Sequence, residues 1–137
     1  MSERVLLSVE DSDSEYYIIG LALKELGLPI RFCRVMDGEQ ALWFLEKTNG
    51  YENAPRPNLI LLNLNLPKKD GFQVLGEIRS SEALRSIPTI IFTTSRDKSS
   101  KTKALALGAE DYISKPETLR DLVETLRTVC SQFLIGQ

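Results

Sequence analysis

The sequence predicts an α/β protein, in which a five-stranded parallel sheet is doubly wound by helices into a (βα)5 three-layer sandwich. Short apolar runs alternate along the chain with segments of helical period, and most of these runs are followed by a helix-start signal. Three of the runs are apolar almost throughout, which is typical of parallel strands covered on both faces. The 137 residues, 42% hydrophobic and 26% charged, are expected to form one domain over 1–137.

Five apolar runs are expected to form the strands of the sheet. They lie at residues 5–9, 30–35, 59–62, 89–92 and 112–113. The first, third and fourth contain few polar residues, so neither of their faces is expected to reach solvent. The longest connection, residues 48–57, is rich in turn-forming residues and is expected to be a surface loop.

Helix-start signals follow four of these runs. Each pairs an acceptor side chain with a second polar side chain three residues later, as in a capping box: Ser12 and Glu15, Asp37 and Gln40, Asp70 and Gln73, and Thr118 and Asp121. Gly27 and Gly108 are expected to end helices, because glycine adopts the left-handed conformation at little cost. The clearest helix is predicted over 119–133, where apolar residues form one stripe.

The sequence contains no histidine. Its absence excludes histidine general bases, phosphohistidine carriers, histidine-ligated metals, and Ser-His or Cys-His nucleophile pairs. The 17 basic and 19 acidic residues leave a net charge of −2, which argues against broad electrostatic binding to nucleic acid or to an anionic membrane. Any chemistry must therefore use carboxylates, hydroxyls, lysines and the backbone.

The cysteines and the N-terminus bear on the cellular compartment. Cys33 and Cys130 lie far apart in apolar stretches and are expected to be buried free thiols, with a disulfide between them left open. The first residues, MSERVLLSVED, offer no secretion signal, and no apolar run approaches the ~18 residues of a membrane span. We therefore expect a cytoplasmic protein that does not enter a membrane.

Polar side chains follow four of the predicted strands. Glu10 and Asp11 follow the first, Asn63 the third, Thr93 the fourth and Lys115 the fifth. Because ligands bind beyond the carboxyl ends of parallel strands, these side chains are expected to form a site together. Two adjacent carboxylates suit a hard cation such as Mg²⁺, and a hydroxyl with an ammonium suits the oxygens of a phosphoryl group. Taken singly, each has a plainer explanation as a helix-start acid, a strand residue or a lysine before a helix.

Four motifs connect these positions with a known family. They are VED at 9–11, NLNLPKKDG at 63–71, TTS at 93–95 and GAEDYISKP at 108–116. In these motifs the sequence resembles the receiver domains of two-component response regulators, over essentially its whole length. The resemblance implies the flavodoxin-like fold of the single-domain regulator CheY. The stretch before and through the second motif is most similar to regulators that serve bacterial phytochrome kinases.

The resemblance implies a role for each matching residue of the site. Glu10 and Asp11 match the metal-binding acid pair, and Asn65 matches the residue whose backbone carbonyl completes the Mg²⁺ site. Thr93 matches the hydroxyl that follows the phosphoryl group, and Lys115 matches the lysine that pairs with that group.

Two further positions match residues of structural or switching importance. Tyr112 matches the aromatic residue that swings inward when the threonine moves. Pro116 matches a proline that a cis peptide bond usually precedes. The resemblance therefore implies both a conformational switch and a cis bond between Lys115 and Pro116.

One position departs from the family pattern. Asn63 stands where the family has the aspartate that accepts the phosphoryl group. An amide is not a nucleophile, so the chain as written is not expected to be phosphorylated there. Loss of one charge near a bound ion is worth up to ~4 kcal/mol at 4 Å and an effective dielectric of 20, so weakened Mg²⁺ binding is expected. Three explanations stay open: an engineered substitution in an ordinary receiver, natural degeneration, and an atypical receiver that signals without phosphorylation.

The resemblance also implies partners. They are a sensor histidine kinase, of phytochrome type by the most similar members, a downstream protein, and a second copy of the chain through the surface of 99–137. Lys98, Lys101 and Lys103 form a basic patch at the start of this surface, or simply a solvated helix face. Because no DNA-binding domain follows the last helix, we expect a stand-alone receiver whose output is protein contact.

Two other classes of protein stay open as lower alternatives. A carboxylate-based phosphohydrolase requires an aspartate nucleophile at a strand end, which Asn63 does not supply. A flavodoxin-like ligand-binding module requires a phosphate loop after the first strand, whereas residues 10–15, EDSDSE, are acidic. The sequence also lacks the G-x-G-x-x-G, Walker and G-x-S-x-G motifs. We therefore expect a signalling module and not an enzyme.

Overall fold

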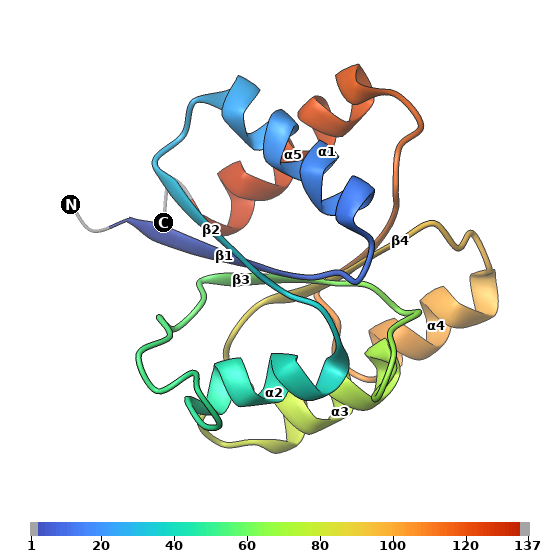
Figure 1. The fold of residues 1–137 in the computed structure, drawn as a ribbon. Helices are drawn as coiled ribbons and strands as arrows, with labels where there is room; N and C mark the ends of the chain where they lie inside the picture. Colours follow the sequence, from blue (N-terminus) through green and yellow to red (C-terminus); the bar gives the residue numbers. More distant parts are fainter. Residues whose placement is uncertain (1–2, 135–137) are drawn as a thin grey trace.

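The computed structural model describes residues 3–134 and contains one parallel sheet of five strands (Figure 1). The strands are β1 (Arg4–Val9), β2 (Ile30–Val35), β3 (Leu59–Leu62), β4 (Thr89–Thr93) and β5 (Asp111–Ser114). Their order in the sheet is β2-β1-β3-β4-β5, and every neighbouring pair is parallel. The predicted α/β class is therefore confirmed, and all five predicted strands are present.

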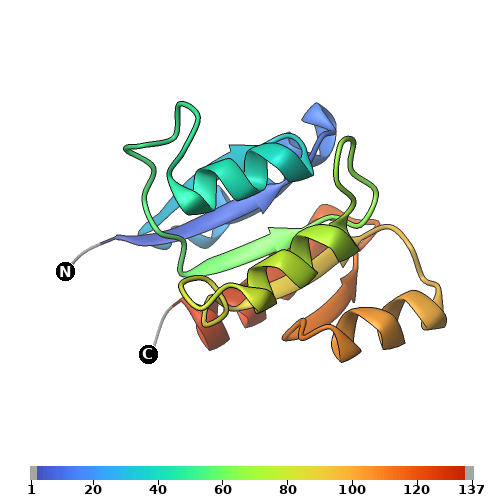
Figure 2. The ribbon, with the colours of Figure 1, turned by 90° about the horizontal axis from the view of Figure 1, so that it is seen from below.

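Five helices connect the strands and cover both faces of the sheet. They are α1 (Asp13–Leu26), α2 (Gly38–Glu46), α3 (Gly71–Ser80), α4 (Lys98–Ala106) and α5 (Leu119–Phe133). Helices α1 and α5 lie on one face, and α2, α3 and α4 lie side by side on the other (Figures 1 and 2). The predicted surface loop at 48–57 contains neither helix nor strand and leads into β3.

Two apolar cores separate the sheet from its helices. Leu6, Leu61 and Phe92 face α1 and α5, whereas Leu7 and Leu62 face the other helical layer. Consecutive strand residues thus point to opposite cores, which explains why β1 and β3 are apolar almost throughout.

The four predicted helix starts are confirmed. Each predicted cap residue accepts a hydrogen bond from the backbone N–H three residues later: Ser12 from Glu15, Asp37 from Gln40, Asp70 from Gln73, and Thr118 from Asp121. Asp70 and Gln73 form the complete capping box, with the Gln73 side chain accepting from the Asp70 N–H. Gly27 ends α1 with φ 64°, and Gly108 follows α4 with φ 104°.

The two cysteines are free thiols in different layers. Cys130 is fully buried in the core under α1 and α5, and Cys33 is half-buried against the other core. The sheet lies between them, so the disulfide that the sequence left open is not formed. Within residues 3–134, no helix is long and apolar enough to span a membrane.

Candidate functional site

The strand register brings the predicted site residues to one edge of the sheet. Val9 of β1 pairs with Leu62 of β3, so Glu10 and Asn63 follow neighbouring positions, and the Asn63 N–H donates to the Val9 carbonyl at 3.2 Å. On the other side, Thr93 is the last residue of β4, and its carbonyl accepts from the Lys115 N–H at 2.7 Å. The four strands β1, β3, β4 and β5 thus present one polar edge.

A buried ion pair forms the centre of this edge. The Lys115 ammonium lies 2.5 Å from Oε1 of Glu10, and the exposed fractions of the two side chains are 7% and 3%. The same ammonium lies 3.5 Å from Oε2 of Glu15, in the first turn of α1. Because charged groups are buried at a high cost unless they are paired, these contacts fix the direction of the Lys115 side chain.

The second oxygen of Glu10 binds donors from two other segments. Oε2 accepts from the Ser12 N–H at 3.1 Å and from the Asn63 side-chain amide at 3.3 Å. Arg34, on β2, donates to the Glu10 backbone carbonyl at 2.9 Å. Both carboxylate oxygens of Glu10 therefore already have partners, and Asn63 contributes as a hydrogen-bond donor, which a carboxylate at that position would not do.

The other two predicted metal ligands differ from Glu10 in their exposure. Asp11 and Asn65 are both exposed, and within residues 3–134 no three acidic, cysteine or histidine side chains form a cluster suited to a metal ion. A divalent cation prefers several oxygen ligands, whereas Glu10 is already bound by an ammonium and two N–H donors. In this arrangement, the Lys115 ammonium holds the buried carboxylate that a divalent ion would need.

The predicted switch residues meet at Ser95, in the loop after β4. The Tyr112 hydroxyl donates to the Ser95 carbonyl at 3.2 Å, and the Ser114 hydroxyl donates to the same oxygen at 3.0 Å. The Ser95 N–H in turn donates to the Thr93 hydroxyl at 3.3 Å. Thr93 is fully buried and Tyr112 is 7% exposed, so the aromatic ring points inward and is linked to Thr93 through Ser95.

The cis peptide bond implied before Pro116 is a wrong prediction. Among residues 3–134 no peptide bond is cis, so Lys115 and Pro116 are joined by a trans bond. The trans form is the ordinary preference of such a bond by about 0.5–1 kcal/mol. With this backbone, the Lys115 N–H still bonds to β4 and its side chain still reaches Glu10.

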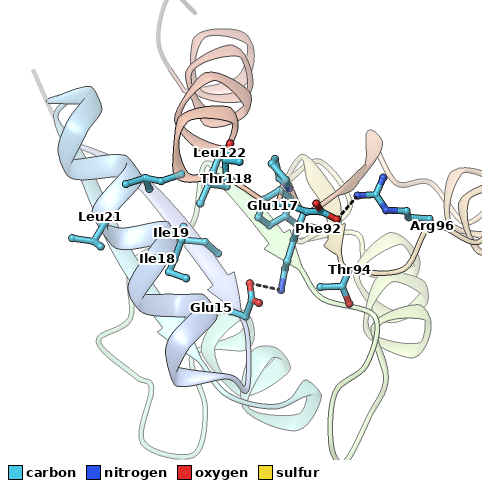
Figure 3. Close-up of a pocket in the computed structure, with 13 residues that line it drawn as sticks. Glu15, Ile18, Ile19, Leu21, Phe92, Thr94, Arg96, Glu117, Thr118 and Leu122 are labelled. Atoms are coloured by element: carbon cyan, nitrogen blue, oxygen red, sulfur yellow. Dashed lines mark ion pairs between the residues drawn. The ribbon is translucent and has the colours of Figure 1, made fainter.

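A groove lies beside the site and was not predicted from the sequence. It has a volume of about 450 Å³ and lies between α1 and the start of α5 (Figure 3). Glu15 and Lys115 lie on its wall next to Ile18, Pro116 and Leu119. The sequence indicated Glu15 as a capping residue in an acidic segment, and nothing in the pattern indicates that its carboxylate pairs with Lys115.

Comparisons with known proteins agree with this architecture. The chain matches the model of the response regulator receiver domain over residues 6–127. It is 38% identical over 131 residues to the response regulator Rcp1 of Synechocystis sp., which covers 96% of this chain and 89% of that protein.

Two solved structures are close in both fold and sequence. The crystal structure of the Mn²⁺-bound form of Rcp1 gives a TM-score of 0.88 at 37% identity and covers 98% of this chain and 96% of that chain. The crystal structure of the phosphorylated cyanobacterial phytochrome response regulator RcpA gives 0.92 at 34% identity, with 99% and 97% covered. Since the family model, the sequence of Rcp1 and both folds extend over the strand-end site, the chain belongs to the response regulator receiver family of two-component signalling.

Proposed function

We propose that this chain is a stand-alone receiver that signals through protein contact and does not accept a phosphoryl group at residue 63. The observation that carries the proposal is Asn63 itself, which follows β3 and donates its side-chain amide to Glu10. Phosphoryl transfer to a receiver requires a carboxylate oxygen that attacks phosphorus, and the amide lacks that nucleophile. The chain thus acts as a signalling module and not as an enzyme.

The remaining site residues keep their proposed roles in switching. Thr93, Tyr112 and Lys115 are the side chains that would move when the charge or the contacts in the pocket change. The hydrogen bonds that join Tyr112 and Thr93 through Ser95 support this role, because a shift of the loop after β4 reaches both side chains. A partner that contacts this loop would act on the same residues.

Weak Mg²⁺ binding is part of the proposal. A divalent ion at this edge would use Glu10, Asp11 and the carbonyl of Asn65 as ligands and would supply positive charge to the pocket. Mn²⁺ occupies a crystal structure of the related Rcp1, which supports a divalent metal as the ligand class. The pairing of Glu10 with Lys115 and the neutral amide at residue 63 support low affinity.

The proposed partners are proteins of a signalling pathway. A sensor histidine kinase of phytochrome type is the first candidate, since RcpA is a phytochrome response regulator by name. A downstream protein and a second copy of this chain, through the surface of 99–137, complete the set. The location is proposed to be the cytoplasm, and no direct contact with nucleic acid or membrane is proposed.

The decisive experiment measures phosphorylation by mass. The chain and an Asn63→Asp variant are incubated with a small acyl phosphate and Mg²⁺, and their intact masses are compared. We expect one added phosphoryl group on the variant and none on the unchanged chain. Labelling that maps to Asn63 would overturn the proposal.

The Asn63→Asp variant also separates two explanations. If the restored acid takes up the phosphoryl group, the rest of the pocket is competent, and the side chain at residue 63 alone prevents phosphorylation. If the restored variant stays unlabelled, other residues of the pocket have also lost the chemistry.

A further inference from the structure

Lys115 is held by more than one acidic side chain. Its ammonium lies 2.5 Å from Glu10 and 3.5 Å from Glu15, which come from the end of β1 and the first turn of α1. Figure 3 shows Glu15 turned inward from α1, with its ion pair to the ammonium drawn as a dashed line. The ammonium thus lies between two carboxylates where β1, β5 and α1 meet.

The side chain at residue 63 is neutral and supplies no anionic partner to Lys115. A buried ammonium needs anionic partners, because a desolvated charge is costly. Asn63 offers no charge and instead donates its amide to Glu10, so it is a third donor to that carboxylate beside Lys115 and the Ser12 N–H. Among residues 3–134, the carboxylates paired with Lys115 are therefore Glu10 and Glu15.

We propose that the Lys115 ammonium is the resident cation of the strand-end pocket and that it excludes divalent metal ions by competing for Glu10. This inference rests on the proposed function, in which residue 63 carries no charge. The lysine occupies the buried carboxylate that a divalent ion needs, since Asp11 is exposed. A divalent ion then binds only where it displaces the ammonium from Glu10. Glu15 is a positioning residue, because it holds the ammonium from the side of α1.

The charge balance of the pocket predicts how the affinity for a divalent ion changes when Lys115 is removed. With Lys115 present, Glu10, Asp11 and Glu15 bring three negative charges against its one positive charge, and the neighbouring Arg34 pairs with Asp13 instead. Replacing the lysine by methionine keeps most of the side-chain volume and removes the competing cation. A divalent ion then meets a buried carboxylate whose Oε1 has lost its ammonium partner, so its affinity is expected to rise when the lysine is removed.

The first test measures Mn²⁺ affinity by isothermal titration calorimetry in the absence of any phosphodonor. We expect Lys115→Met to lower the dissociation constant at least tenfold, which corresponds to about 1.4 kcal/mol. Lys98→Met, the same substitution at an exposed lysine of α4, controls for the change in net charge and is expected to leave the constant within about twofold. Equal or weaker binding by Lys115→Met would overturn the proposal.

A second test keeps Lys115 in place. Glu15→Gln removes one of its two carboxylate partners at a side chain that is 37% exposed, so the fold is expected to persist. The rate at which an acylating reagent labels Lys115, followed by peptide mass mapping, should rise at least threefold, with the rate at Lys98 unchanged. An unchanged rate at Lys115 would refute the role of Glu15. If circular dichroism shows Lys115→Met to be unfolded, the Mn²⁺ titration is repeated with Lys115→Gln, for which the same tenfold decrease is expected and equal or weaker binding would overturn the proposal.

The two proposals fail separately. Phosphoryl labelling at Asn63 would overturn the proposed function without any metal-binding measurement. Unchanged Mn²⁺ binding by folded Lys115→Met would overturn only the role of Lys115 as the resident cation, and Asn63 would still lack a nucleophile.

Discussion

At the scale of single residues, close backbone packing fixes Asn63. The Gly71 N–H donates to the Leu64 carbonyl at 2.9 Å, which draws the start of α3 against the end of β3. A Cβ atom added at Gly71 would lie 2.5 Å from the Asn63 carbonyl oxygen and 2.8 Å from the Leu64 Cα. These neighbours are backbone atoms, so they cannot turn aside as a side chain would.

We therefore expect Gly71→Ala to disturb the site as well as the fold. The free energy of unfolding should fall by about 1–3 kcal/mol, the usual cost of overpacking, in urea denaturation. The side-chain amide resonance of Asn63 should shift, because its bond to Glu10 depends on that backbone. Gly76→Ala is the matched control in the same helix: a Cβ there meets nothing within 4 Å, so stability should rise by about 0.5–1 kcal/mol. Equal effects of the two substitutions would contradict this explanation.

Some residues of the site could be predicted from the sequence and others could not, for a physical reason. Glu10 and Lys115 follow strands directly, and parallel strands align their ends, so their meeting could be predicted. Glu15 and Ser95 act through side-chain direction and through a backbone carbonyl. Neither property leaves a pattern in the order of residues. The same holds for Arg34, which donates to the Glu10 carbonyl from near the end of β2.

At the scale of elements, α4 is the helix that the sequence described least well. It buries one residue, Ala104, so it has no apolar stripe that a periodic pattern could indicate. Its cap is Asp97, which accepts from the Ser99 N–H at 3.1 Å and from the Ser99 hydroxyl at 2.9 Å. In the four helices with a predicted start, the cap residue accepts from the N–H three residues later. In α4 the cap residue accepts from the N–H two residues later, so the spacing does not match the capping-box pattern.

The cap makes the order of α4 depend on pH. Hydrogen bonds from the Ser99 hydroxyl and then from its N–H hold the pKa of the Asp97 carboxyl below its ordinary value. A lowered folded-state pKa gives stability that is fully present above the unfolded value, about 3.9, and is lost as the pH falls through the folded value. Carbon chemical shifts of α4 should therefore show fraying as the pH drops below about 3.9.

Asp97→Asn separates this titration from general acid unfolding. Asparagine is also a good cap residue but does not titrate, so α4 in the variant should lose the acid-dependent fraying. The shifts of α3, whose cap is the capping box of Asp70 and Gln73, serve as an internal reference. The explanation fails if α4 of the variant frays over the same pH range as α4 of the unchanged chain.

At the scale of the whole molecule, two cores on one sheet explain why the fold was predictable. Leu6 and Leu61 pack under α1 and α5, whereas Leu7 and Leu62 pack on the opposite side. A strand that serves two cores needs apolar residues at every position, and that run is visible in the sequence. The Glu10–Lys115 pair adds a contact of much longer range, because it joins residues 105 positions apart, at the ends of strands that β3 and β4 separate.

This long-range pair is expected to couple the two ends of the chain energetically. Removing one partner of a buried ion pair costs about 3–5 kcal/mol, because the other charge is left uncompensated. Glu10→Gln should lie at the low end, since Glu15 still faces the ammonium, and Lys115→Met should lie at the high end. The double variant buries no unpaired charge, so it should lose less stability than the sum of the single variants by about 1–3 kcal/mol. Urea denaturation of the four proteins measures this coupling, and additive losses would mean that the pair contributes no mutual stabilisation.

Mn²⁺ should restore part of the stability of Lys115→Met alone, because an ion that binds only the folded state raises the free energy of unfolding.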